Sequence, residues 1–137
     1  MCSSLKQENI DTIADRYGVN LFVYFGSYQT SFYHKESDID IAFLCGGMLD
    51  HSLKMKLLRD LMIYHRKSEI DLIDLKTAAP LLRYEIAKNG KILYEREPGL
   101  FERHRLYYIK RYYELKPVMK EEMKNIGKSI LEMINDV

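Results

Sequence analysis

The stretch that decides the fold is Leu21–Leu44, LFVYFGSYQTSFYHKESDIDIAFL. An apolar run, LFVYF, ends at Gly26 and Ser27, and a second apolar run begins at the DID segment that contains Asp38 and Asp40. This pattern predicts a strand, a tight turn, a short polar connection and a second strand. Because side chains i and i+2 of a strand lie on one face, we expect both aspartates to project together.

These residue types indicate phosphate and metal chemistry. Two carboxylates at one strand end repel each other unless a cation lies between them, and their hard oxygens suit Mg²⁺. Gly26 permits a sharp turn and a close approach of phosphate, while Ser27 offers a hydroxyl and an amide to an anionic oxygen. Together they supply what nucleotidyl transfer requires. The alternative is a plain hairpin with a Gly-Ser turn and solvated strand-end aspartates.

The GS-x10-DxD pattern resembles the signature of the nucleotidyltransferase superfamily related to DNA polymerase beta. At this length the chain is similar to the minimal nucleotidyltransferases, the MNT or MntA-type antitoxins that are encoded beside a HEPN-domain toxin. The resemblance covers residues 5–95. It implies an α/β fold: a small mixed sheet bearing the site on one face, with helices packed on one side and a C-terminal helical tail. We expect a nucleotidyltransferase domain over 1–97 and a helical extension over 98–137 packed on it.

A third carboxylate is expected on the strand predicted for residues 69–75, EIDLIDL. In the resembling family a third acid lies on the strand after the intervening helix, and Asp71 matches that position best. Such an acid completes a two-metal site or takes the proton of the attacking hydroxyl. Asp74 falls on the opposite face by parity, and Glu69 shares the face of Asp71 but lies further out. Both remain candidates, as does a merely solvated acid.

The rest of the chain is predicted as alternating helices and strands. Apolar periodicity indicates helices over residues 3–17, 49–65 and 77–89, the last of which tolerates Pro80 only in its first turn. KILYE, residues 91–95, is predicted as a short final strand. The tail over residues 100–136 is predicted as two helices, because Pro117 breaks or restarts a helical run.

Composition excludes several classes of protein. The chain has 137 residues, 47% of them hydrophobic, which is enough for one domain with a real core. A net charge of +1 gives no global field that would attract nucleic acid or a membrane. No apolar run has membrane-spanning length, the N-terminus is too polar for a signal peptide, and two cysteines show no metal or disulfide spacing. We expect a soluble, cytoplasmic protein.

Three further signals have structural alternatives. Arg59 and His65 have the R-x5-H spacing of a HEPN ribonuclease motif, but a surface arginine and a helix-end histidine fit this alternating pattern better. His34 and Lys35 lie in the loop after Ser27, where Lys35 would reach a triphosphate or is simply solvated.

The third signal is the segment over residues 103–116, RHRLYYIKRYYELK, which interleaves basic and aromatic residues. This mixture is typical of helices that pack tyrosines on a core, of protein interfaces, and of surfaces that bind single-stranded nucleic acid. We rank the three interpretations in that order.

The resemblance implies transfer of AMP from ATP to a hydroxyl. Gly26 and Ser27 would hold the β- and γ-phosphates, with Lys35 as a further nucleotide contact. Asp38 and Asp40 would ligate two Mg²⁺ ions, and Asp71 would complete the second metal site and act as base. The implied acceptor is a tyrosine of a cognate HEPN ribonuclease toxin, which the chain would silence and with which it would form a complex. The alternatives are a small-molecule acceptor of the aminoglycoside type and a non-catalytic antitoxin that acts by binding.

Overall fold

The structure, a computed structural model, describes residues 8–26 and 38–135. Its centre is a mixed four-stranded sheet with the strand order β3-β2-β1-β4. The two central strands pair antiparallel, β4 pairs antiparallel with β1, and β3 pairs parallel with β2. The strands are β1 (Val19–Phe25), β2 (Ile39–Cys45), β3 (Ile70–Asp74) and β4 (Lys91–Glu95). The predicted strands and the mixed sheet are confirmed.

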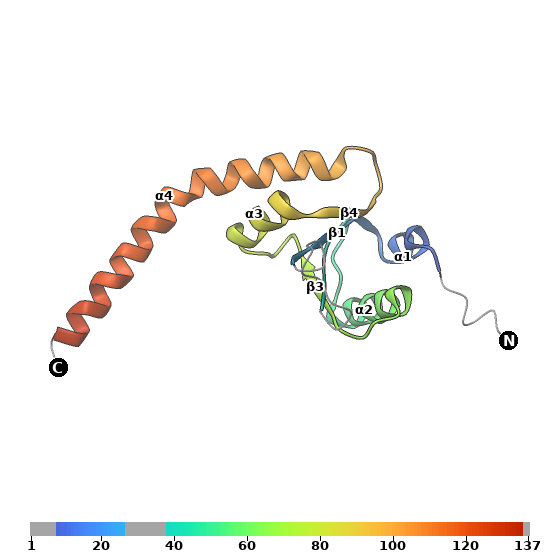
Figure 1. The fold of residues 1–137 in the computed structure, drawn as a ribbon, viewed down its shortest axis with the longest axis horizontal. Coiled ribbons are helices and arrows are strands. Elements are labelled where there is room, and N and C mark those ends of the chain that lie inside the picture. Colours follow the sequence, from blue (N-terminus) through green and yellow to red (C-terminus); the bar gives the residue numbers. More distant parts are fainter. Residues whose placement is uncertain (1–7, 27–37, 136–137) are drawn as a thin grey trace.

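Helices cover both faces of this sheet (Figure 1). On one face, α1 (Ile10–Tyr17) and α2 (His51–His65) bury Ile13, Leu57 and Leu61 against the odd-numbered residues of β2. On the other, α3 (Pro80–Asn89) and the first part of α4 (Leu100–Asn135) pack on Leu21, Val23 and Ala42. The α/β fold is as predicted and differs in one respect, because helices were expected on one side of the sheet only. The amphipathic pattern of a helix fixes which of its sides is buried but not which sheet face it covers.

Local sequence signals set the ends of these helices. The Asp50 carboxylate caps α2 by accepting a hydrogen bond from the Leu53 amide at 2.8 Å. Gly18 ends α1 in the left-handed conformation with φ of 67°. Pro80 is in the first turn of α3, as predicted, where its missing N–H costs no intrahelical hydrogen bond.

The C-terminal tail is one helix of 36 residues rather than the two that Pro117 predicted. Pro117 lies inside α4, where it removes one intrahelical hydrogen bond, and Figure 1 shows the helix turning partway along its length. A proline weakens a helix at one turn, but the hydrogen bonds on either side of it still form. None of the helices in the described part of the chain has the length and apolarity needed to cross a membrane.

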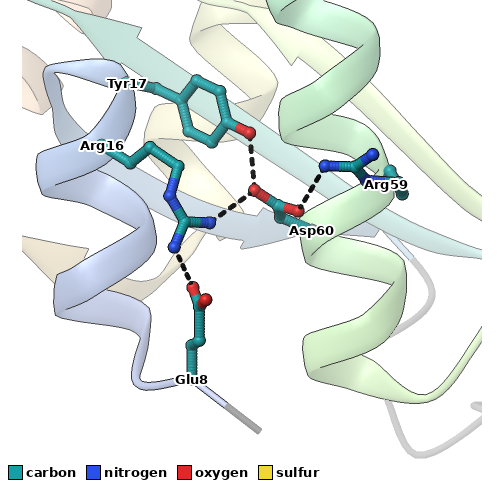
Figure 2. Close-up of polar contacts among 5 residues, drawn as sticks. All are labelled: Glu8, Arg16, Tyr17, Arg59 and Asp60. Carbon is teal, nitrogen blue, oxygen red and sulfur yellow. Dashed lines mark hydrogen bonds and ion pairs between the residues drawn. The ribbon is translucent and has the colours of Figure 1, made fainter. Parts of the chain in front are cut away.

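A polar cluster joins α1 to α2 (Figure 2). The buried Asp60 carboxylate accepts hydrogen bonds from the Tyr17 hydroxyl at 2.5 Å and from Arg16 Nη1 at 2.8 Å. Arg59 lies 3.5 Å from the other Asp60 oxygen, and Glu8 pairs with the outer side of Arg16. Burial, together with the hydrogen bond to Asp60, raises the pKa of Tyr17 to about 12, so its hydroxyl remains a donor at neutral pH.

We expect Asp60→Ala to destabilise the protein by about 2 kcal/mol, because it leaves the Tyr17 hydroxyl and one arm of Arg16 without their acceptor. Urea unfolding measures this difference. Glu8→Ala is the matched control: it removes an exposed partner of the same arginine and is expected to cost no more than about 0.5 kcal/mol. Equal losses for the two variants contradict the assignment of Asp60 as the member that holds the cluster together.

Candidate active site

Two of the predicted acids lie opposite each other on neighbouring strands. Asp40 is the second residue of β2 and pairs in register with Asp71, the second residue of the parallel strand β3. Side chains directly opposite each other in such a pair lie on the same face of the sheet. Asp38 immediately precedes β2 and shares the parity of Asp40. The structure therefore brings the three carboxylates to one end of the β2–β3 pair.

The acids face the side of the sheet that α3 and α4 cover. Residues of the same parity, Ala42 and Leu44 on β2 and Ile73 on β3, belong to the core on that side. The helices cover those residues. At the start of the two strands, in contrast, Asp40 is only partly buried and Asp71 is exposed. The open end of the sheet thus provides a solvent-reachable position for a charged ligand.

The electrostatics of Asp40 show how tightly the acids are gathered. Partial burial, the charge of Asp71 with its hydrogen bond, and the charge of Asp38 together raise the pKa of Asp40 to about 6. Burial and the neighbouring acids act on this carboxyl in the same direction, against its charged form. The site is therefore a concentration of negative charge that a cation would relieve.

Gly26 brings the end of β1 against these acids. Phe25, the last residue of β1, pairs with Asp40, and Gly26 follows with φ of 76°. A Cβ atom built at Gly26 would overlap the Asp40 carboxylate oxygen Oδ2. Glycine is required here twice, once by the left-handed backbone and once by the close approach of the acid.

The remaining predicted site residues divide into two groups. Ser27 and Lys35, with His34, lie outside the described residues. Asp74 and Glu69, the alternatives to Asp71, are described and lie elsewhere: Asp74 pairs in register with Phe43 and accepts a hydrogen bond from the Lys76 amide, and Glu69 precedes β3. Of the three acids weighed for this position, Asp71 is the one beside Asp40.

The donor set fits a hard divalent cation. Asp38, Asp40 and Asp71 present carboxylate oxygens, the ligand type that Mg²⁺ prefers. Within the described ranges, no three acidic, histidine or cysteine side chains are close enough to share one ion. Asp40 and Asp71 are within hydrogen-bonding reach of each other, whereas Asp38 acts on Asp40 through its charge alone, so two of the three carboxylates are in direct contact.

The R-x5-H pair does not form a site of its own. The Arg59 side chain is 67% exposed and interacts with Asp60, as expected for a surface arginine. His65, the last residue of α2, donates from Nδ1 to the Leu61 carbonyl, and its Nε2 lies 2.6 Å from the Tyr24 hydroxyl. Burial lowers the pKa of the His65 imidazole.

A basic cleft of about 500 Å³ lies on the α3–α4 face and was not predicted. Part of its lining, Arg103, His104, Tyr107 and Tyr108, belongs to the basic and aromatic segment noted above, but Lys76 and Arg83 come from other parts of the chain and no sequence spacing links them to it. Arg83 donates to the carbonyls of Leu75 and Lys76 and lies 5.4 Å over the Tyr108 ring, while Lys76 donates to the Gly47 carbonyl. The Arg83 bonds join α3 to the connection that follows β3, and the Lys76 bond joins that connection to the turn after β2.

Comparison with known families agrees with this geometry. Residues 8–99 match the family model described as polymerase beta, nucleotidyltransferase, which spans Gly26 and all three acids. The chain belongs to this nucleotidyltransferase family.

Individual relatives are also similar. Over 76 residues the chain is 36% identical to the protein adenylyltransferase MntA of Shewanella oneidensis, a match that covers 56% of this chain and 54% of MntA. The matched part thus spans about half the length of that relative. A chain in a crystal structure of a toxin–antitoxin with AMP-PNP superposes with a TM-score of 0.72 at 26% identity, covering 86% of this chain and 95% of the other. A chain in the crystal structure of a mutant MntA-HpeT toxin–antitoxin gives 0.67 at 25% identity, with the same two coverages.

We expect the repulsion among the acids to cost this nucleotidyltransferase stability. Asp40→Asn keeps the volume of the side chain and removes one charge, so it should stabilise the chelator-treated protein by about 1 kcal/mol at pH 7, after allowing for solvent screening. Because the pKa of Asp40 is raised in the fold, wild-type stability should fall as pH rises from about 4 to about 6. Denaturant unfolding at several pH values measures both effects.

The matched control is Asp11→Asn, which removes an exposed charge from α1. We expect that variant to change stability at pH 7 by no more than about 0.5 kcal/mol. A loss of stability in Asp40→Asn would show that the acids are not in repulsive contact.

Proposed function

We propose that this chain is a protein adenylyltransferase antitoxin, which transfers AMP from ATP to a tyrosine hydroxyl of a cognate HEPN ribonuclease toxin and so neutralises it. The observation that carries this proposal is the group formed by Gly26, Asp38, Asp40 and Asp71 at one end of the sheet. The likeness to an adenylyltransferase and to a chain of a toxin–antitoxin structure with AMP-PNP supports the choice of ATP and of a protein acceptor.

The proposed reaction is a displacement at the α-phosphorus of ATP. The tyrosine oxygen forms a bond to that phosphorus, the bond from the phosphorus to the oxygen bridging to the β-phosphate breaks, and pyrophosphate leaves. The hydroxyl proton passes to Asp71 as base or to water. This chemistry requires positioning and charge stabilisation rather than a covalent nucleophile on the enzyme.

Each residue of the site has a role in this proposal. Gly26 and Ser27 would position the β- and γ-phosphates at the end of β1, with Lys35 as a further contact. Asp38 and Asp40 would hold two Mg²⁺ ions, with Asp71 as a ligand of the second. Bound Mg²⁺ would supply the positive charge that lets a triphosphate lie beside three carboxylates. We assign residues 1–97 to the transferase domain and 98–137 to its helical extension. We expect this chain and its cognate toxin to act in the cytoplasm.

The test is intact-mass analysis of the cognate HEPN protein after incubation with this chain, ATP and MgCl₂. We expect the mass of the HEPN protein to increase by one or more AMP units and peptide mapping to locate them on a tyrosine. The Asp38→Asn enzyme is the control and should be at least about a hundredfold slower, because it removes one metal charge without changing the size of the side chain. Omission of Mg²⁺ should have the same effect.

Other outcomes distinguish the competing functions. A stable complex with no change in mass would favour neutralisation by binding alone. Neither complex nor modification would favour a small-molecule hydroxyl as the acceptor. Equal rates for the Asp38→Asn and wild-type enzymes would overturn the metal assignment.

We also expect Gly26→Ala to reduce the transfer rate about tenfold or more and to destabilise the protein by about 1 kcal/mol. The added methyl group strains a backbone of positive φ and displaces the Asp40 carboxylate. Initial rates of AMP incorporation and denaturant unfolding measure the two effects separately.

Gly18→Ala is a matched control for this variant. Gly18 has a similar φ of 67°, but a Cβ atom there meets nothing within 4 Å. Gly18→Ala should therefore destabilise the protein about as much as Gly26→Ala does but leave the transfer rate unchanged. If both variants lose activity in proportion to stability, the close approach of Gly26 to Asp40 has no role in the reaction.

A further inference from the structure

The second half of α4 lies beyond the body of the domain. Figure 1 shows the helix passing α3 and continuing away from the sheet. From Lys120 to Asn135, every residue except Gly127 is exposed. Large apolar side chains are nevertheless frequent there, and Met123, Met133 and Ile134 are 68%, 70% and 61% exposed. Contiguous exposed apolar surface of this kind marks an interaction site in a soluble protein.

Five apolar residues from Met119 to Met133 form a stripe with a coiled-coil spacing, while Leu131 and Ile134 lie outside it. They follow one another at intervals of 4, 3, 4 and 3 residues. The members of the stripe are Met119, Met123, Ile126, Ile130 and Met133. An average spacing of 3.5 residues keeps a seam facing one partner helix along its whole length.

A groove at the near end of the stripe offers the first contact. It has a volume of about 790 Å³ and lies between Leu81 at the start of α3 and the inner side of α4. Its apolar lining is Leu81, Tyr112, Met119, Met123 and Ile126. The Tyr112 ring is held in place by stacking on Tyr84, with ring centres 4.1 Å apart. One wall of the groove is therefore rigid and continuous with the stripe.

The distal helix has little stability of its own. It contains Gly127 in its interior, which costs about 1 kcal/mol relative to alanine, and Pro117 weakens the turn before it. A helical segment of this length without tertiary packing is marginal in water. A partner that packs along the stripe would supply the missing stabilisation.

Charge around the groove indicates what kind of partner fits. Lys116, Lys120 and Lys124 line it at intervals of four residues, so they follow one edge of the helix, and Glu122 is the one acid in the lining. An apolar seam edged by lysines complements a helix whose apolar stripe is edged by acidic residues.

A second copy of this chain matches the surface poorly. If two copies pair antiparallel along the stripe, centred on Ile126, e positions face e positions, so Lys120 lies against Ile134 and has no acidic partner there. If they pair parallel, heptad positions place Lys120 against Leu115 and Glu122 against Gly127. Neither arrangement pairs opposite charges across the seam.

We propose that the groove between α3 and α4, together with the stripe from Met119 to Met133, docks an amphipathic helix with acidic edges on the partner protein. The partner is the cognate toxin of the proposed function, on which this inference rests. The docking surface is separate from the acids at the end of β2 and β3, so binding and AMP transfer are separable by mutation.

The experiment measures the affinity of the full-length chain for the cognate HEPN protein by calorimetry, without ATP and with a chelator. We expect Lys120→Glu/Lys124→Glu and Met123→Asp each to weaken binding about tenfold or more. The matched control is Lys110→Glu/Lys128→Glu, which makes the same change of net charge on α4 at positions outside the groove lining and should change affinity less than about twofold. Wild-type affinity should fall as NaCl concentration rises.

Hydrogen exchange gives a second readout that does not depend on the variants. We expect the amides of residues 120–135 to exchange rapidly in the free chain and to be protected in the complex. Unchanged exchange in that segment, or equal effects of the groove and control variants, overturns the docking surface. A dimer of the chain alone that Met123→Asp dissociates also overturns it, in favour of a second copy as occupant.

The docking surface and the proposed function can fail separately. If AMP is transferred but no complex depends on the groove, the docking surface is wrong and the proposed function stands. If the complex depends on the groove but no AMP is transferred by the wild-type chain, the docking surface stands and the proposed activity does not.

Discussion

The parallel pairing of β2 with β3 is the constraint on which the candidate site depends, because it holds Asp40 and Asp71 together against their mutual repulsion. Nothing in the acids themselves favours their gathering, as the raised pKa of Asp40 shows. They are held together by the parallel pairing of β2 and β3, and a parallel pair needs a crossover connection. That connection contains α2, whose Leu57 and Leu61 are fully buried against the sheet. The apolar burial of α2 on one face of the sheet therefore stabilises a fold that holds mutually repelling acids on the other face.

The antiparallel neighbour β1 places Gly26 beside these acids. Because Phe25 pairs with Asp40, the chain leaves β1 directly beside the acids, and a side chain at Gly26 would occupy the space of the Asp40 carboxylate. The end of β1 therefore lies directly beside a cluster of negative charge. In the proposed function a triphosphate would lie beside these carboxylates, and a bound cation would offset the repulsion between them.

Much of this was predictable from sequence because strand parity is a strict rule. Alternation placed Asp38 and Asp40 on one face and Asp71 and Asp74 on opposite faces, while the choice of Asp71 rested on the family resemblance. Two features were not predictable. The sheet face that each helix covers depends on packing between distant segments, and the contact of Asp60 with Tyr17 joins residues 43 positions apart. Asp60 resembles an ordinary surface acid in sequence, since only tertiary structure buries it.

In the C-terminal tail, the rule that a proline ends a helix gave a wrong prediction. Pro117 predicted two helices, yet one helix continues through it, because the proline removes a single hydrogen bond and its neighbours retain theirs. In the tyrosine-rich segment before it, Tyr108 is buried in the core and Tyr112 stacks on Tyr84, whereas Tyr107 and Tyr113 are exposed. Packing thus accounts for part of this segment. The part left without a structural role is the plainer stretch after Pro117, where methionine and isoleucine repeat at a coiled-coil spacing and stay exposed in the described part of the chain. Exposed apolar residues on an otherwise polar helix add no stability to the free chain, so burial of this stripe against the proposed partner would give it a role that the chain alone does not supply.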